Sequence, residues 1–186
     1  MNNTNNKKKW FILAIAFLFL MIVGLFIALR DKSTSTLTNQ ESAITGIRKF
    51  MGDDSLKIEY INESTFAYDE NMAVAVYVSE FDQFEINSKT GKLLQFGPKP
   101  SSIKNYDETS RYAESELEVM ARDYLAKNAP EVNLTKLVSN GGNKGQEHYF
   151  FRWEDRSRNT TEGYPFIQVG FSRGGSVLGY INALGL

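Results

Sequence analysis

Residues 84–96 read FEINSKTGKLLQF, and this stretch decides the fold that the sequence predicts. Short strand-like runs lie on either side of the four-residue segment SKTG. Gly91 ends that segment and supplies the positive φ that a tight turn needs. The stretch therefore predicts a β-hairpin with strands at 84–87 and 92–96.

A second copy of this hairpin lies close to residue 186. Residues 172–180 read SRGGSVLGY and align with residues 88–96, SKTGKLLQF, at an offset of 84 residues. Each copy has a serine, a basic residue, a glycine in the fourth place, two aliphatic residues and a final aromatic residue. The same order of a helix followed by strands precedes both copies, which favours an internal duplication.

The first module, residues 41–97, is expected to begin with a helix. Thr38 and Glu41 have capping-box spacing, apolar residues follow at helical spacing, and Gly52 is a natural helix stop. Before the hairpin, strands are predicted at 57–61 and 72–78. In the second of these, alternate residues share one apolar face: Met72, Val74, Val76 and Val78.

The second module, residues 109–186, follows a linker at 98–108 that is rich in proline and serine. Thr109 or Ser110 can cap a helix that reaches about Asn128. Four strands are predicted after it, at 134–138, 148–154, 166–171 and 176–181. The fold class is therefore α+β, with two small modules in which one helix packs on an antiparallel sheet.

Residues 10–29 (WFILAIAFLFLMIVGLFIAL) contain no charged, amide or hydroxyl side chain. A helix of this length covers about 30 Å, the thickness of the hydrocarbon layer, so we expect a single membrane-spanning helix. The basic excess on its N-terminal side places residues 1–9 in the cytoplasm and the later residues outside the membrane, behind a tether at 30–40. A cleaved signal peptide is the alternative, although Phe26 and Ile27 stand where small residues are needed.

The composition excludes several kinds of chemistry. The chain has no cysteine and one histidine, His148, which rules out disulfides, thiolate metal sites and cysteine nucleophiles. A formal net charge of −1 argues against nucleic acid as a partner. For Glu80, Asp82 and Glu85, a solvated strand end is favoured over the paired carboxylates of a hydrolase. We expect no catalytic residue, no metal and no cofactor.

The order of motifs in both modules resembles a known family. Residues 73–78 (AVAVYV) and 84–93 (FEINSKTGKL) resemble the closing strand and hairpin of a PepSY domain, with Asn87 where that family usually has an acidic residue. The second module resembles the related propeptide-like repeats of Gram-positive cell-envelope proteins. It is also similar to the closing segments of the PepSY-bearing spore germination protein that partners a cortex-lytic enzyme. The matching segments are 148–155 (HYFFRWED), 162–165 (EGYP), 167–172 (IQVGFS) and 174–178 (GGSVL).

The resemblance implies a cystatin-like, non-catalytic domain outside the cytoplasmic membrane. It also implies a protein partner, an envelope peptidase or a cell-wall hydrolase, which the modules would bind or modulate. We expect binding through exposed sheet edges near 84–91 and 156–161. Six residues are candidates for partner binding: Phe84, Ile86, Lys89, Arg152, Arg156 and Arg158.

Two further expectations concern residues outside these edges. Trp153 alternates with Tyr149 and Phe151 along its strand, so it is predicted to pack in the core. An alternative function is a structural or assembly subunit of a membrane complex. In that case the membrane helix would pair with others through Gly24 and Ala28, which have small-xxx-small spacing.

Overall fold

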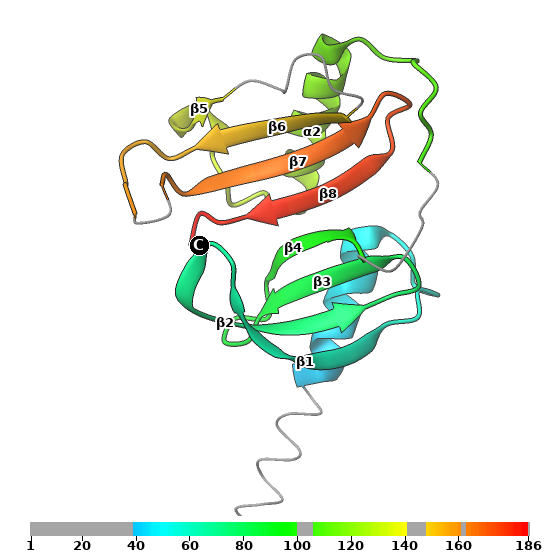
Figure 1. Ribbon diagram of the computed structural model, residues 1–186, viewed down its shortest axis with the longest axis vertical. Coiled ribbons are helices and arrows are strands. Elements are labelled where there is room, and N and C mark those ends of the chain that lie inside the picture. Colours follow the sequence, from blue (N-terminus) through cyan, green and yellow to red (C-terminus); the bar gives the residue numbers. More distant parts are fainter. Residues whose placement is uncertain (1–38, 100–105, 141–147, 161–162, 186) are drawn as a thin grey trace, which may run out of the picture. The chain divides into compact units, whose positions relative to one another are not determined.

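The computed structural model describes residues 39–99, 106–140, 148–160 and 163–185. Within these ranges the chain forms an α+β fold with one antiparallel sheet of eight strands (Figure 1). The helical elements are residues 39–51, α2 (Glu114–Asn128) and the short 3₁₀ helix η1 (Leu134–Lys136). The strands of the first half are β1 (Glu59–Phe66), β2 (Asp69–Val78), β3 (Asp82–Asn87) and β4 (Leu93–Pro98). Those of the second half are β5 (Val138–Ser139), β6 (His148–Glu154), β7 (Phe166–Ser172) and β8 (Val177–Asn182).

The two halves share a single sheet. The strand order is β1-β2-β3-β4-β8-β7-β6-β5, and β4 pairs with β8 through Gln95↔Ile181 and Phe96↔Tyr180. The expectation of a separate small sheet in each module is therefore wrong. The physical reason is that β4 and β8 would each leave a row of unpaired backbone groups at a sheet edge, and their pairing satisfies both rows.

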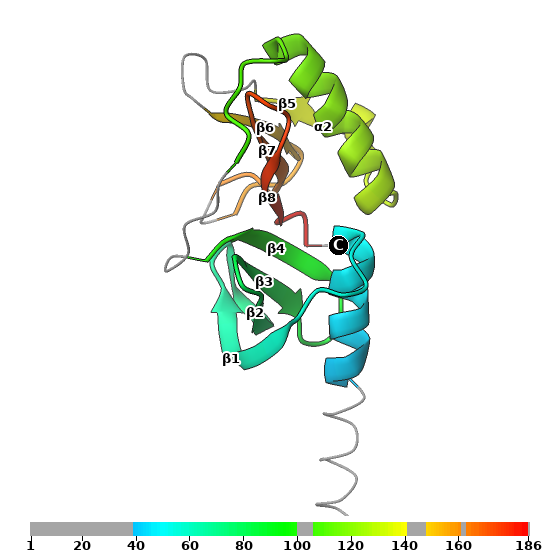
Figure 2. The ribbon, with the colours of Figure 1, turned by 90° about the vertical axis from the view of Figure 1, so that its right-hand side faces the viewer.

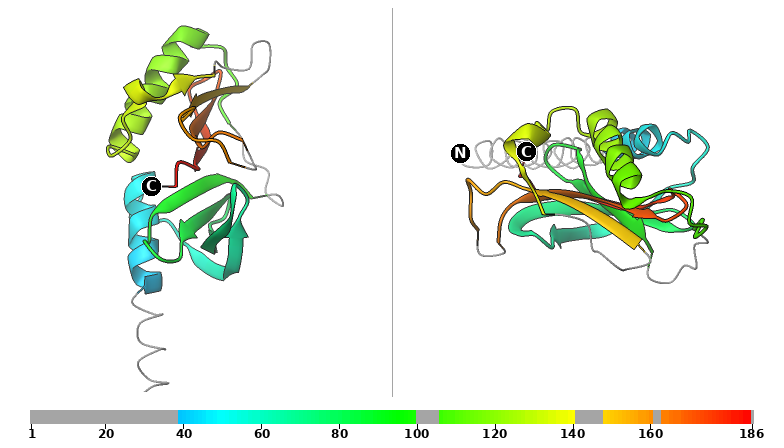
Figure 3. Two further views of the ribbon diagram at one scale, coloured as in Figure 1. Left: turned by 90° about the vertical axis from the view of Figure 1, so that its left-hand side faces the viewer. Right: turned by 90° about the horizontal axis from the view of Figure 1, so that it is seen from above.

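Both helices cover the same face of the sheet, as Figures 2 and 3 show. The helix at 39–51 buries Ala43 and Ile47, and α2 buries Leu117, Ala121 and Leu125. These side chains belong to one core cluster with a row of strand residues that lie opposite one another across the sheet. The row consists of Tyr77, Phe84, Phe96, Tyr180, Val169 and Phe151.

The predicted hairpins and the apolar face of β2 are confirmed. Gly91 and Gly175 have φ values of 71° and 84° in the two closing turns. Val74 and Val76 share one face of β2 and belong to a smaller cluster with Phe66 and Leu94, apart from the main core. Trp153 is 1% exposed in the main core, as its alternation predicts.

Helix α2 begins later than the sequence predicts, at Glu114 instead of after Thr109 or Ser110. The Glu116 carboxylate accepts a hydrogen bond from the Ala113 backbone N–H at 2.7 Å, which closes the first turn at that point. The residues before it are held to the β7–β8 turn instead. Gly174 N–H donates to the Asp107 carbonyl, and Arg111 N–H donates to the Arg173 carbonyl.

The predicted strand at 134–138 is wrong for most of its length. Asn133 accepts a hydrogen bond from the Thr135 N–H at 3.0 Å, which favours a turn. The chain therefore forms the 3₁₀ helix Leu134–Lys136, and only Val138–Ser139 joins the sheet.

The membrane segment expected at 10–29 lies outside the described residues. Among the residues that are described, no helix is both long and apolar enough to cross a membrane.

Candidate functional site

The structure brings two of the six candidate residues into the core. Phe84 is 0% exposed and Ile86 is 3% exposed, and both face the helices. They lie on β3, which has β2 on one side and β4 on the other. The expectation that residues 84–91 form an exposed sheet edge is therefore wrong, although Lys89 is exposed in the turn after β3. The outer strands of the sheet that the described residues form are β1 and β5.

The three candidate arginines bond within the chain. Arg152 donates to the Gln168 side chain at 2.8 Å, and its guanidinium carbon lies 3.8 Å from the centroid of the Phe166 ring. Arg156 pairs with Glu154 at 3.3 Å. Arg158 donates to Asp155 at 2.6 Å and to the Leu184 carbonyl at 2.7 Å. Of the three, Arg152 lies on the sheet face that the helices leave uncovered.

That uncovered face, which we call the open face, carries a row of residues across five strands that is polar except for Ile181 on β8. Glu85 on β3 is opposite Gln95 on β4, and Gln95 is opposite Ile181 on β8. Ile181 is opposite Gln168 on β7, which is opposite Arg152 on β6. These side chains share a face because directly opposite residues of antiparallel strands point the same way.

A second row beside it has three glycines between Gln83 and Phe150. Gln83 is opposite Gly97, Gly170 is opposite Gly179, and Phe150 is opposite Gly170. Continuing the register of β4 and β8 brings Gly97 level with Gly179. Since glycine has no side chain, this row leaves a trough across the centre of the sheet.

The trough appears as two adjoining cavities. One of about 250 Å³ is lined by Gly97, Phe150, Leu178, Gly179 and Ile181, among others. The other, of about 180 Å³, is lined by Gln83, Glu85, Gln95, Gly97 and Pro98. They share Gln95, Gly97 and Pro98. We call the two cavities together the open-face groove.

Two acceptor atoms in the groove are buried without a hydrogen-bond partner among the described residues: Glu85 Oε2 and Gln95 Oε1. The other Glu85 oxygen accepts a long hydrogen bond of 3.4 Å from the Gln83 amide. Burial raises the pKa of the Glu85 carboxyl above its ordinary value, and the bond from Gln83 opposes this shift. Buried acceptors without donors are costly, so a ligand that brings donors would be favoured here.

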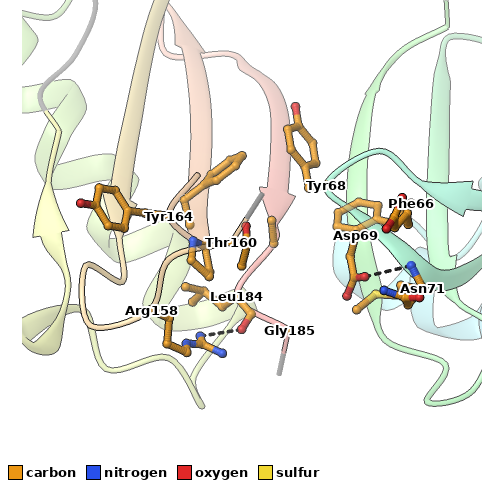
Figure 4. Close-up of a pocket in the computed structure, with 14 residues that line it drawn as sticks. Phe66, Tyr68, Asp69, Asn71, Arg158, Thr160, Tyr164, Leu184 and Gly185 are labelled. Carbon is orange, nitrogen blue, oxygen red and sulfur yellow. Dashed lines mark hydrogen bonds between the residues drawn. The ribbon is translucent and has the colours of Figure 1, made fainter. Parts of the chain in front are cut away.

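A third cavity, of about 260 Å³, lies where the β1–β2 turn meets the ends of β7 and β8 (Figure 4). The Tyr68 ring meets the Phe166 ring edge-on at 5.0 Å. Asp69 accepts from the Asn71 N–H at 3.0 Å, and Arg158 reaches the Leu184 carbonyl. Each of these two hydrogen bonds lies on one side of the cavity, and the contact between the Tyr68 and Phe166 rings joins the two sides.

The carboxylates weighed for hydrolase chemistry do not form a pair. Asp82 is 4% exposed and shares a β3 face with Phe84, whereas Glu85 lies on the open face. His148 Nε2 lies 3.1 Å from Glu108 Oε1, and both side chains are exposed. Among the described residues, no group of three or more side chains is placed to hold a metal ion.

Sequence reasoning missed the groove residues Gln95, Gln168, Gly97 and Gly179. One signal was available, because a polar residue or a glycine at every second place of an otherwise apolar strand marks a face that is not packed as core. The cross-strand row itself depends on the β4–β8 pairing, and that pairing joins residues far apart in the sequence.

Comparison with known proteins supports the fold. No protein-family model matches the chain, and no curated protein matches its sequence. Among solved structures, the Bacillus megaterium YpeB C-terminal domain matches with a TM-score of 0.53 at 16% sequence identity. The match covers 77% of this chain and 62% of that one, so this chain spans less than two thirds of its length. The likeness supports the PepSY-like fold that the sequence resemblance implies.

Proposed function

We propose that the chain is a non-catalytic, membrane-anchored regulatory protein that binds an envelope peptidase or cell-wall hydrolase outside the cytoplasmic membrane. The observation that carries this proposal is the open-face groove. It offers a largely apolar trough and two buried acceptors that no described residue pairs with, on a fold that resembles the YpeB C-terminal domain.

The anchor proposed at residues 10–29 would favour partner binding by raising the effective concentration of the domain at the membrane surface. A domain tethered to the membrane meets partners at that surface at a far higher effective concentration than a free domain does. Modest affinity in the groove would then suffice for regulation.

Site-specific photocrosslinking in intact cells tests this function. Pro98 is exposed and lines both cavities of the groove, so a photocrosslinking amino acid there reports on its occupant. Val119 is the matched control, because it is 58% exposed on α2, which covers the other sheet face. We expect position 98, but not position 119, to capture an envelope peptidase or wall hydrolase.

Two results would overturn the proposal. One is equal capture from both positions, which would indicate contact without a specific surface. The other is capture of integral-membrane proteins alone, by an interaction that survives deletion of residues 41–186. That result would favour an assembly subunit acting through the membrane segment.

A further inference from the structure

The open-face groove is shaped for a side chain that the described residues do not supply. A Cβ atom added at Gly97 would meet no atom of the described residues within 4 Å, so these residues leave the space above this strand position open. At Gly179 a Cβ would come within 3.0 Å of the Phe96 carbonyl oxygen. Glycines in strand interiors weaken a sheet, and they often mark a place where another molecule approaches the backbone closely.

The wall of the trough beside Gly170 is apolar, while Tyr106, His148 and Gln168 also line the larger cavity. The Phe150 ring lies over Gly170, where an added Cβ would come within 2.6 Å of the ring. Leu178 is 5% exposed and Ile181 is partly exposed on the neighbouring strand. A cavity of about 250 Å³ with such walls fits one apolar side chain.

The end of the groove at β3 has the opposite character. Glu85 Oε2 and Gln95 Oε1 come from residues directly opposite each other, and both atoms are buried with no hydrogen-bond partner in the described part of the chain. Both are acceptors, and one belongs to a carboxyl group, so a cationic donor complements them in charge and in hydrogen bonding. An ammonium suits two acceptors on separate strands, whereas the planar fork of a guanidinium matches the two oxygens of one carboxylate.

We propose that the open-face groove binds an extended segment of the partner protein in which a lysine stands two positions after an apolar residue, so that both side chains leave the same face of the segment. The apolar side chain fills the trough over Gly97 and Gly179. The lysine ammonium donates to Glu85 Oε2 and Gln95 Oε1. The inference deepens the proposed function by stating what the partner must present.

Titration with defined peptides tests the inference. The full 186-residue chain, labelled with ¹⁵N and kept in a mild detergent, is titrated with a blocked six-residue peptide that has leucine, serine and lysine in this order among further serines. A second peptide has norleucine in place of lysine, and a third has serine in place of leucine. We expect the first peptide to bind at least tenfold more tightly than either control, and to shift the amide signals of Gly97, Gly179 and Gln95.

Two variants locate the contacts. Glu85→Gln removes the negative charge at nearly constant size, so we expect it to abolish the preference for lysine over norleucine. Gly97→Val fills the trough at a position with free space, so we expect it to abolish binding of all three peptides while the spectrum stays that of a folded chain. Gly46→Ala is the control, because Gly46 also has free space around it but lies in the helix at 39–51.

Equal affinity for the lysine and norleucine peptides, or a lysine preference that persists in Glu85→Gln, would overturn the inference. Binding of the leucine–lysine peptide that Gly97→Val leaves unchanged would also overturn it. These failures differ from failure of the proposed function. Crosslinking at position 98 could still capture an envelope enzyme, and the binding chemistry alone would then be wrong.

Discussion

Phe96 on β4 and Tyr180 on β8 lie directly opposite each other, and they are equivalent residues of the two repeats. Tyr180 follows Phe96 by 84 residues, the same offset that aligns the two closing hairpins. Each repeat therefore meets the other through the same position of its last strand. The Phe50 ring lies 5.7 Å from the Phe96 ring and 5.2 Å from the Tyr180 ring, so the junction is part of the shared core.

This junction predicts that the two halves unfold together. Phe96→Ala removes a ring that is 3% exposed at the contact between the halves, so we expect it to lower the free energy of unfolding by about 3–5 kcal/mol. Urea unfolding followed by circular dichroism measures this change. Ile61→Ala, at a side chain 53% exposed on β1, should change it by about 0.5 kcal/mol or less. Two separate unfolding transitions in the native chain would contradict a shared core.

Glu85 predicts a dependence of stability on pH. Burial raises the folded-state pKa of its carboxyl above the ordinary value of 4.5. The contribution of the protonated Glu85 carboxyl to the free energy of unfolding is therefore fully present below the pKa that this group has in the unfolded chain. It is lost as the pH rises through the pKa of the group in the folded chain. Glu85→Gln keeps an uncharged group at all pH values, so we expect the variant to be more stable than the native chain at neutral pH and equal to it in acid.

Chemical unfolding of both chains across a series of pH values measures this difference. Glu63→Gln is the matched control, because Glu63 is exposed on β1. A stability difference between Glu85→Gln and the native chain that stays constant with pH would show that the Glu85 carboxyl is not disfavoured by burial.

We predict that the β7–β8 turn requires glycine at position 174, because Asp107 lies close to this residue. A Cβ atom there would overlap the carbonyl oxygen and the carboxyl group of Asp107. The Asp107 carbonyl accepts from Gly174 N–H at 3.0 Å and from the Ser172 hydroxyl at 2.6 Å, so these groups cannot separate cheaply. We expect Gly174→Ala to cost about 1–3 kcal/mol and to increase amide exchange at Gly174 and Ser172. Gly97→Ala, at an open position, is the control, and equal costs for the two would contradict this account.

Local patterns in the sequence were enough to predict the hairpins and the α+β class. Gly91 and Gly175 mark the two closing turns, and the helix at 39–51 ends at Gly52, whose φ is 70°. These features depend on residues a few positions apart. The alternation of Phe84 and Ile86 with Glu85 and Asn87 also indicates one buried face. This pattern was overlooked when the two apolar residues were chosen as candidates for partner binding.

The joining of the two sheets could not be read in the same way. The β4–β8 pairing connects Gln95 to Ile181, and no local property of either strand specifies its partner. The groove depends on that pairing, because it brings Gly97 beside Gly179 and extends the polar row from Gln95 to Gln168. The start of α2 was missed for a related reason, since the contact between Asp107 and the β7–β8 turn delays the helix.

The orientation expected for the membrane segment at 10–29 predicts a clear labelling pattern. The chain has no cysteine, so a single introduced cysteine is the only thiol in each variant. Lys89→Cys lies at an exposed turn position, and Asn5→Cys precedes the apolar segment. We expect a membrane-impermeant maleimide to label Lys89→Cys in intact cells and Asn5→Cys only after lysis, because the basic residues 7–9 favour the cytoplasmic side. Labelling of Asn5→Cys in intact cells, with Lys89→Cys protected until lysis, would reverse the orientation and place the open-face groove in the cytoplasm, away from any envelope enzyme.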